Sequence, residues 1–346
     1  MNIIYCTSYL QAPISITIAE KSAGDFEIFF QQKRLYDFFS KLYNKKHLYM
    51  FPAPKFYSIK KHKFKLIKYF FQTLSDKRKL KKKLKSYSNH NIYYFGYAYS
   101  EFETWTVKYL SKKNNVFYTQ SVTIFKDLKI LNTLYSWIVR LPYILLYGIK
   151  FDVLNNGLTT FTKITDDFGT KIGAKPVDIQ SDENLAGGLV AKKFNFSGTD
   201  ILYLTGAVIE EGFIEKNEFI SKNDKLLEFL ERKYGKDKIS IKIHPRFSNF
   251  YSRENDFNKI EKTIPANVIL TNFKVVIAYD STVLFEAANK DILSVSLLNY
   301  YVPRSEKTKS SFIKYVHDNL KAGKKVHFPE NIEQLNLILD TAINNT

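Results

Sequence analysis

Three short stretches of the sequence combine residue types that could bind a phosphate or move a proton. The first is ISIKIHP, residues 239–245, in which a β-branched apolar run ends at His244 and is stopped by Pro245. Proline cannot donate to a strand ladder, so it ends the strand and fixes where the histidine ring is held. An imidazole can donate a hydrogen bond to a phosphate oxygen. We predict this role for His244, and a structural role at the end of a buried strand is the alternative.

The second stretch is YDSTVLFEAAN, residues 279–289, in which a β-rich run ends at Asp280, Ser281 and Thr282 and a helix is expected to follow. A helix start with free N–H groups and two hydroxyls can hold a phosphate. The alternative is an ordinary helix cap, since Asp and Ser are common there.

The third stretch is FDVLNNGLTTF, residues 151–161, which leads from a predicted strand into Asn155, Asn156 and Gly157. Asn-Gly is a frequent turn dipeptide, so a plain turn is one interpretation. An amide can orient a hydroxyl by hydrogen bonding but cannot accept its proton. Asp152 is the nearest carboxylate that could do so.

Alternating strands and helices must position these residues. The periodicity predicts strands at 2–8, 25–30, 47–53, 91–97, 115–121, 149–157, 200–206, 238–245, 267–272, 274–280 and 291–298. It predicts helices at 14–21, 32–43, 60–86, 101–113, 127–145, 219–235, 281–289 and 330–343. Such alternation is typical of α/β proteins with parallel sheets covered by helices. Ligands of these proteins bind at the carboxyl ends of the strands, which is where His244 and Ser281 are expected.

A stretch of Gly, Pro and polar residues with weak periodicity, 165–199, separates two such series of elements. We therefore predict a first domain over 1–175, a linker over 176–199 and a second domain over 200–346. A chain of 346 residues is long for a single core, which agrees with two domains.

The formal charge of +18 favours anionic partners. Much of the excess lies between Lys41 and Lys85, where Asp76 is the only acidic residue. Within this region, 60–86 alternates lysines with apolar residues at helical spacing and is predicted to be an amphipathic basic helix that binds an anionic membrane surface. A solvated helix face over a core is the alternative.

Other features bear on compartment and cofactors. The single cysteine, Cys6, excludes an internal disulfide and fits a reducing compartment. The start of the chain lacks the pattern of a signal peptide. The most apolar segment, 134–149, contains Arg140 and Pro142 and is too short to span a bilayer. We expect a cytoplasmic protein, peripheral on the inner face of the cell membrane.

Common motifs for metals and nucleotides are missing from the sequence. There is no G-x-G-x-x-G, P-loop or H-E-x-x-H motif, no Cys/His cluster and no Asp-x-Asp, and the six histidines are scattered. The sequence therefore predicts no metal site and no bound cofactor.

The sequence resembles the bacterial sialyltransferases of glycosyltransferase family 52 and, more loosely, the related polysialyltransferases. The shared marks are His244-Pro245, followed by Ser281-Thr282. The opening MNIIYCTSYLQ is similar to the first strand and T-x-x-Q turn of that family, with one additional residue. LYLTGAVIEEGFI, 202–214, looks like the segment that opens the second domain.

The resemblance implies a GT-B architecture, in which two Rossmann-like domains with parallel sheets face a central cleft. It implies a metal-independent, inverting transfer of sialic acid from CMP-sialic acid to a terminal sugar of a bacterial surface glycan, lipooligosaccharide or capsule. His244, Ser281 and Thr282 would hold the departing phosphate, and Gly206 and Pro245 would complete the nucleotide site. The partners would be the nucleotide-sugar donor and the glycan acceptor.

The sequence departs from the family at two places. Where the family has an acidic pair before a glycine, this chain has Asn155-Asn156-Gly157. The first carboxylate of that pair is the expected general base, and loss of such a base costs about 10²–10⁴-fold in rate. Asp152 or the pair Asp166/Asp167 would have to replace it. Pro265-Ala266-Asn267 stands where some relatives carry an acid for the ribose hydroxyls.

Two other functions stay open at this stage. One is a GT-B glycosyltransferase that uses a different nucleotide-sugar donor. The other is a basic nucleic-acid-binding protein, which charge alone suggests. No recognisable binding module accompanies the charge, so we expect no nucleic acid partner. Assembly into a homodimer also stays open.

Overall fold

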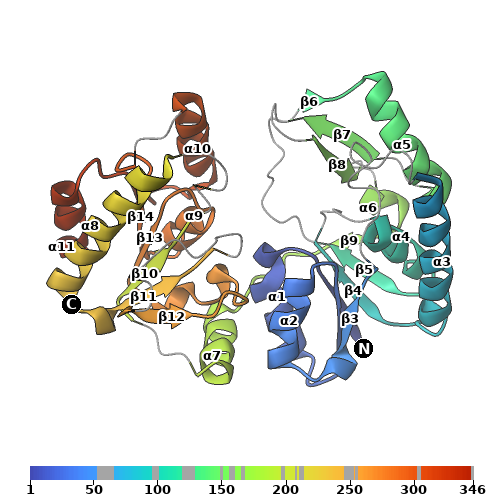
Figure 1. The fold of residues 1–346 in the computed structure, drawn as a ribbon. Coiled ribbons are helices and arrows are strands. Elements are labelled where there is room, and N and C mark those ends of the chain that lie inside the picture. Colours follow the sequence, from blue (N-terminus) through green and yellow to red (C-terminus); the bar gives the residue numbers. More distant parts are fainter. Residues whose placement is uncertain are drawn as a thin grey trace. The chain divides into compact units, whose positions relative to one another are not determined.

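The computed structural model describes residues 1–52, 66–95, 101–118, 129–148, 151–155, 160–164, 168–195, 199–206, 209, 214–244, 253, 256–301 and 305–343. The chain divides into two compact units, Met1–Ser181 and Asp182–Thr346. Figure 1 shows that each unit is a sheet covered by helices.

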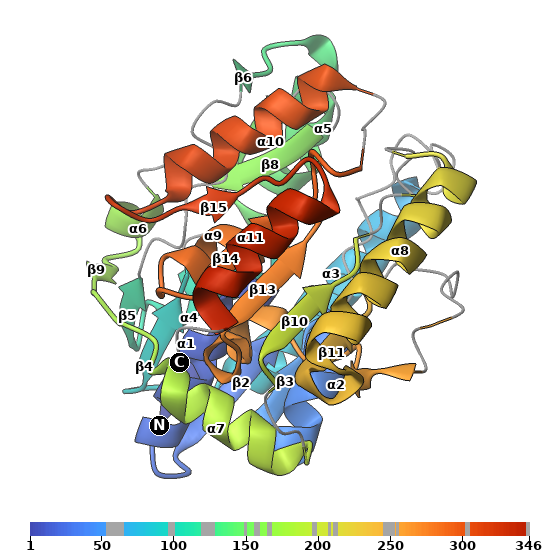
Figure 2. The same ribbon diagram turned by 90° about the vertical axis from the view of Figure 1, so that its left-hand side faces the viewer.

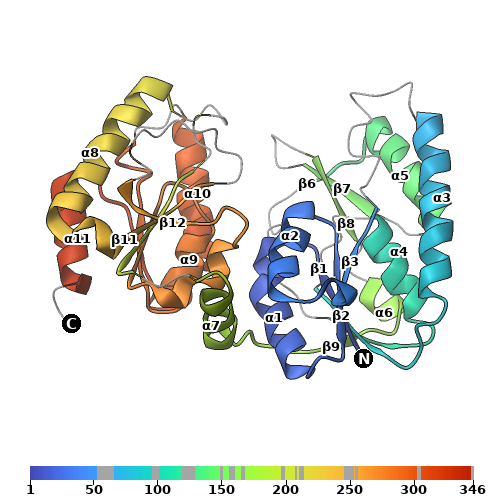
Figure 3. The same ribbon diagram turned by 60° about the horizontal axis from the view of Figure 1, so that its bottom comes forward.

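The first unit contains a six-stranded parallel sheet in the order β3-β2-β1-β4-β5-β9. Its strands are β1 (Asn2–Cys6), β2 (Phe26–Phe30), β3 (Leu48–Met50), β4 (Asn91–Tyr94), β5 (Asn115–Tyr118) and β9 (Lys175–Pro176). Its helices are α1 (Ala12–Lys21), α2 (Lys33–Leu42), α3 (Leu66–Leu84), α4 (Glu101–Leu110) and α6 (Phe168–Lys171). Figure 3 shows α1 and α2 on one face of the sheet and α3 and α4 on the other.

Aromatic side chains fill the core between this sheet and helices α3 and α4. The Tyr5 ring lies 5.3 Å from the Phe29 ring and 5.8 Å from the Phe51 ring, measured between centroids. Edge-to-face and offset pairs of this kind stabilise a core beyond the area that they bury. Leu80 and Leu84 of α3 are buried in the same cluster. Aliphatic side chains such as Ile3, Ile92 and Leu110 complete this cluster.

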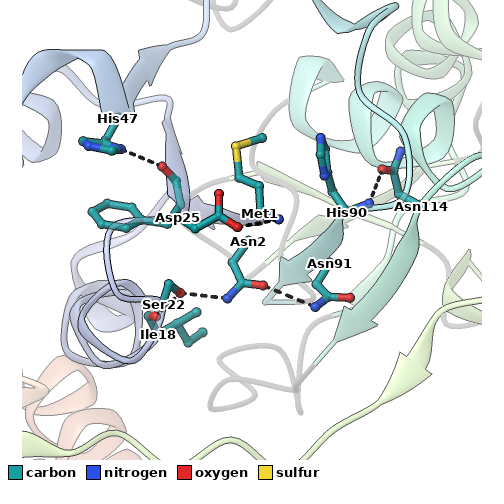
Figure 4. A network of polar contacts seen from close by, with 10 residues as sticks. Met1, Asn2, Ile18, Ser22, Asp25, His47, His90, Asn91 and Asn114 are labelled. Carbon is teal, nitrogen blue, oxygen red and sulfur yellow. Dashed lines mark hydrogen bonds and ion pairs between the residues drawn. The ribbon is translucent and has the colours of Figure 1, made fainter.

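A polar network closes the amino edge of the first sheet, where its strands begin (Figure 4). Asn2 Nδ2 donates to Ser22 Oγ at 2.7 Å, and Asn91 Nδ2 donates to Asn2 Oδ1 at 3.3 Å. The Met1 amino group pairs with Asp25 at 2.8 Å. These bonds connect the first residues of β1 and β4 to the turn before β2, so this edge is occupied by its own side chains.

A small antiparallel sheet, β6-β7-β8, also belongs to the first unit. It comprises β6 (Lys129–Ile130), β7 (Phe151–Asn155) and β8 (Thr160–Ile164), and α5 (Leu134–Tyr147) packs on β7. The parallel pairing expected of strand 149–157 is therefore wrong. The connection from β7 to β8 is short, and a short connection permits only antiparallel pairing.

The second unit contains a six-stranded parallel sheet in the order β12-β11-β10-β13-β14-β15. Its strands are β10 (Ile201–Leu204), β11 (Ile239–Lys242), β12 (Asn258–Ile260), β13 (Val275–Ala278), β14 (Leu293–Ser296) and β15 (Val326–His327). Its helices are α7 (Glu183–Lys193), α8 (Lys216–Tyr234), α9 (Val283–Ala288), α10 (Glu306–Asn319) and α11 (Ile332–Ile343). In Figure 2, α8 and α11 cover one face of this sheet.

Numbered along the chain within each sheet, both sets of strands follow the order 3-2-1-4-5-6. This is the strand order of the Rossmann fold, in which ligands bind where the order reverses, between strands 1 and 4. The prediction of an α/β protein with two Rossmann-like parallel sheets is confirmed. The switch points lie between β1 and β4 in the first unit and between β10 and β13 in the second.

Two parts of the second unit differ from the sequence prediction. Residues 267–272 form two 3₁₀ turns, Ala266–Val268 and Leu270–Asn272, in place of a strand. A short buried apolar run cannot be assigned to a strand by periodicity alone. The expected linker over 176–199 contains α7, which packs against these turns. A Cβ atom on Gly187 of α7 would approach the Val268 carbonyl oxygen to 3.2 Å, so glycine permits this contact.

Helix α11 offers a matched test of the core of the second unit. The Leu339 side chain is fully buried, whereas that of Leu337 is 69% exposed. Leu339→Ala should lower the free energy of unfolding by about 2–5 kcal/mol, because it removes buried methyl groups and leaves a cavity. Leu337→Ala should change it by about 0.5 kcal/mol or less. Urea denaturation of both variants measures the difference, and equal losses would contradict this packing.

Candidate functional site

The predicted phosphate-binding residues follow three neighbouring strands of the second sheet. β10 lies between β11 and β13, and Leu204 of β10 aligns with Lys242 and with Ala278. Two residues further along, Gly206, His244 and Asp280 therefore leave the carboxyl edge of the sheet at one level. The two outer strands are two strand spacings apart, about 10 Å. Side chains that reach inward from both sides can contact one small anion over the end of β10.

Backbone hydrogen bonds fix the position of His244. Its N–H donates to Thr205 Oγ1 at 2.9 Å, and the Thr205 N–H donates to the Lys242 carbonyl oxygen at 3.1 Å. Thr205 is buried, and His244 is partly exposed. The chain is thus held past the end of β11 in a defined position, with the histidine at the surface. Pro245 lies outside the described residues.

Ser281 and Thr282 differ in how their hydroxyls are used. Ser281 Oγ accepts a hydrogen bond from the Val283 N–H at 3.3 Å, which agrees with the capping interpretation of this residue. The Thr282 side chain makes no capping hydrogen bond, and both residues are partly exposed. α9 has only 6 residues, so its dipole is weak and the hydroxyls must supply most of any attraction for an anion.

Glu286 lies one turn beyond Thr282 on α9, and the sequence analysis did not select it. Burial raises the pKa of Glu286 to about 7, Lys290 acts in the opposite direction, and Glu183 raises it further. Its Oε1 atom has no hydrogen-bond partner among the described residues. Helical side chains lean toward the preceding turn, so this carboxyl group leans toward Thr282. Its signal in the sequence is an acid four residues after Thr282 in an otherwise apolar helix.

The corresponding switch point of the first sheet also carries buried polar groups. Gln11 Oε1 accepts hydrogen bonds from the backbone N–H groups of Thr7 at 2.7 Å and Ser8 at 3.1 Å. Thr7 Oγ1 lies 3.4 Å from Glu103 Oε1 of α4. Burial raises the pKa of Glu103 well above its ordinary value, opposed by the hydrogen bond from Thr7. Glu103 is fully buried and therefore positions the turn after β1, leaving Ser8 at the surface.

The residues predicted to take the proton of the acceptor lie on or next to the antiparallel sheet. The Asn155 backbone ends β7 and pairs with Lys129 and Thr160. Asn156 and Gly157 lie outside the described residues, as do Asp166 and Asp167. Asp152 is partly buried and aligns with Lys163 across the β7–β8 pair.

In the sequence we also singled out the segment Pro265-Ala266-Asn267 and the lack of metal-binding motifs. Asn267, at the position where the resembled family carries an acid in some members, is buried in a 3₁₀ turn. Within the described part of the chain, no three His, Cys, Asp or Glu side chains lie together as a metal ion would require.

The chain matches no protein-family model and no curated protein sequence. Among solved structures it is similar to the UDP-GlcNAc 2-epimerase from Methanocaldococcus jannaschii, with 14% identity over 99% of this chain and 93% of that chain and a TM-score of 0.48. It is also similar to the UDP-GlcNAc 2-epimerase from Neisseria meningitidis bound to UDP-GlcNAc, with 13% identity over 100% of both chains and a TM-score of 0.42. The E. coli ADP-heptose lps heptosyltransferase II shares 12% identity over 99% of both chains, with a TM-score of 0.37. Likenesses this distant carry no conclusion about activity.

The raised pKa of Glu286 predicts a pH-dependent loss of stability. The folded protein holds this proton up to about pH 7, whereas the unfolded chain releases it near its ordinary pKa of 4.5. The free energy of unfolding should therefore fall as pH rises between these values and stay lower above them. Glu286→Gln should be more stable than the natural chain by about 1–3 kcal/mol at pH 8 and equally stable at pH 4.

Urea denaturation at both pH values measures this difference. Glu228→Gln, which replaces an exposed acid on α8, is the control and should be as stable as the natural chain at both pH values. A Glu286→Gln variant that is no more stable than the natural chain at pH 8 would contradict the assignment of a neutral, buried carboxyl group.

Proposed function

We propose that the protein is a glycosyltransferase that binds a nucleotide-sugar donor at the carboxyl edge of the second sheet. The observation that carries the proposal is the register of β11, β10 and β13. It brings Gly206, His244 and Asp280 to one level at the switch point of a Rossmann-ordered sheet, and the Ser281-Thr282 pair follows Asp280 directly. This is the place where folds of this class bind nucleotides. A histidine and hydroxyls are groups that can hold a phosphate there.

Each of these groups has a defined task in the proposed reaction. The acceptor hydroxyl attacks the anomeric carbon of the donor, and the bond from that carbon to the phosphate oxygen breaks. Negative charge then develops on the departing phosphate. His244 on one side and Thr282 on the other donate hydrogen bonds to that charge, and donors already in position stabilise a transition state at little cost of reorganisation. Gly206 has no side chain, so a phosphate can approach the backbone closely.

Glu286 fits the same donor site as the partner of a sugar hydroxyl. A carboxylate oxygen that lacks a partner can accept a hydrogen bond from the ribose of a nucleotide. Burial of this acid costs stability, and a hydrogen bond from a ligand would offset that cost. Groups that destabilise the folded protein are often found where function needs them. In this role Glu286 replaces the acid that is missing at Pro265-Ala266-Asn267.

We propose CMP-sialic acid as the donor and a terminal sugar of a bacterial surface glycan as the acceptor. The support is the sequence resemblance at His244-Pro245 and Ser281-Thr282, together with the register that ends β11 and β13 at the same edge on either side of β10. Another nucleotide sugar is the second candidate, and it is favoured by the same strand order. The proposed chemistry requires no metal, because the histidine and hydroxyl donors take the place of a cation at the phosphate.

The proposed reaction also needs a general base for the acceptor hydroxyl. Asp152 is the described carboxylate of the β6-β7-β8 sheet, and it is partly exposed. We propose that it accepts the proton of the acceptor hydroxyl, with the Asn155-Asn156 connection orienting the sugar. Glu103 cannot take this role, because its side chain is fully buried and an acceptor sugar cannot reach it.

Replacing His244 tests the donor site. His244→Ala should weaken CMP binding by about 10- to 150-fold, because a hydrogen bond to a charged group contributes about 1.5–3 kcal/mol. Isothermal titration with CMP, UDP and GDP measures the affinities and ranks the donor classes. The control is His317→Ala, an exposed histidine of α10 in the same unit. Unchanged CMP affinity in His244→Ala would overturn the site, and tighter binding of UDP or GDP would replace the donor while keeping the site.

Replacing Asp152 tests the base. Asp152→Asn should lower the turnover rate by about 10²–10⁴-fold and leave CMP affinity unchanged, because a general base acts on the acceptor alone. Asp178→Asn, an exposed acid of the same unit, is the control. Asn155→Asp should raise the rate, with a pH profile that follows the new carboxylate. Full activity in Asp152→Asn would show that another residue takes the proton.

A further inference from the structure

Helix α5 of the first unit carries an apolar face that the described protein does not cover. Five large apolar side chains of this helix are each more than half exposed: Leu134, Trp137, Ile138, Leu141 and Leu145. Their spacing of three and four residues places them in one stripe along the helix. The exposed Ile130 of β6 lies just before the helix starts. Large contiguous apolar surfaces of this kind normally mark an interaction site.

The opposite side of α5 is used by the core. Ser136, Leu146 and Tyr147 are buried, and the carbonyl oxygen of Leu146 accepts a hydrogen bond from Lys77 of α3. Lys108 of α4 donates to the carbonyl oxygen of Gly148, which caps the helix, at 2.8 Å. The exposed stripe is therefore held by a helix that is fixed on its other side. A helix that is apolar on both sides is otherwise found buried or in contact with lipid.

Helix α3, beside it, supplies a basic surface. Figures 1 and 3 show α3 and α5 on the same flank of the first unit. The exposed face of α3 contains Phe71 and the basic side chains Lys68, Arg78, Lys79, Lys81 and Lys82, and the exposed Lys85 follows the end of the helix. Leu80 and Leu84 are buried in the core, and Phe70 and Leu74 pack partly against it. Phe70, Leu74, Leu80 and Leu84 of α3 therefore pack toward the core, whereas Phe71 and the basic side chains lie in solvent.

We propose that α5 inserts its apolar stripe into the interface of an anionic membrane while the lysines of α3 bind the lipid headgroups. The stripe supplies buried apolar area, and the lysines supply electrostatic attraction, which are the two contributions that interfacial binding requires. Trp137 lies in the stripe next to Arg140, whose guanidinium group is 5.7 Å from the Trp137 ring centroid. Trp and Arg are both favoured at the boundary between lipid tails and headgroups.

The charge of the chain favours a membrane over a second copy of the protein. Pairing two copies through α5 would bring two basic α3 helices toward each other in a chain of net charge +18. Like charges oppose such a contact, whereas anionic lipid neutralises them. No described helix is long and apolar enough to span a bilayer, so the contact proposed is with the membrane surface. This inference does not depend on the proposed donor site.

The chain contains two tryptophans, which permits a direct test. Trp105 is 8% exposed and Trp137 is 59% exposed. In a Trp105→Phe variant, Trp137 alone reports on the stripe. Vesicles of phosphatidylglycerol and phosphatidylcholine in equal amounts should shift its emission to shorter wavelength, and brominated lipid should quench it. At the same low salt concentration, vesicles of phosphatidylcholine alone should shift and quench the Trp137 emission much less.

Two sets of substitutions separate the apolar contribution from the basic one. Leu141→Ser combined with Leu145→Ser should weaken binding to the anionic vesicles at least about tenfold, because both side chains leave the lipid. Leu337→Ser is the matched control, since Leu337 of α11 and Leu145 are both 69% exposed. Changing Lys79, Lys82 and Lys85 to Gln should weaken binding by about fivefold for each lysine. CMP binding and circular dichroism should stay unchanged in all of these variants.

Two outcomes would overturn the proposal. The first is a Trp137 emission that anionic vesicles leave unchanged, with equal vesicle binding by the natural chain and the double serine variant. The second is an emission that shifts with protein concentration in the absence of lipid, together with a doubled mass in sedimentation equilibrium that the double serine variant loses. That result would make the stripe an interface between two copies of this chain.

Discussion

The hydrogen-bonded register of the parallel strands determines where every candidate site residue of the second unit lies. Parallel neighbours start and end on the same sides of a sheet, so the residues that follow them emerge together. Leu204 aligns with both Lys242 and Ala278. His244 follows Lys242 by two residues, and Ser281 follows Ala278 by three. They are far apart in sequence and adjacent in space only because β10 lies between β11 and β13. A shift of one residue in either pairing would turn alternate side chains to the other face of the sheet and disassemble the site.

The polar groups inside the two units follow a pattern that the register explains. At the amino edge of the first sheet, the groups satisfy one another, as Asn2, Ser22 and Asn91 do. At the carboxyl edges, buried acids face unfavourable surroundings. Glu103 and Glu286 both have a raised pKa because burial removes water from the carboxylate. The cost of burying such an acid is lower when its carboxyl group is neutral or when a ligand pairs with it.

Local chemistry in the sequence was sufficient to predict the two parallel sheets and the strand ends that carry His244 and Ser281. Alternating apolar strands and amphipathic helices report directly on burial, so the periodicity identified most elements of both sheets. The sequence could not predict the antiparallel pairing of β7, because the residue pattern of one strand does not reveal its partner. Nor could it select Glu103 or Glu286, since an acid inside a helix is usually exposed. Whether such a residue is buried depends on the packing of several elements at once.

Charge and apolar surface are separated in the first unit in a way that the sequence conceals. The lysine-rich segment has the pattern of an amphipathic membrane helix, yet Leu80 and Leu84 of α3 are used by the core. The exposed apolar residues belong to α5, which lies in the most apolar segment of the sequence. In the proposed membrane contact, α3 would therefore supply the basic surface and α5 the apolar one. The division has a physical reason, because the side of α3 that stabilises the unit cannot also enter lipid. A second helix must therefore supply the apolar surface, and α5, anchored by Lys77 and Lys108, can do so without unfolding the unit.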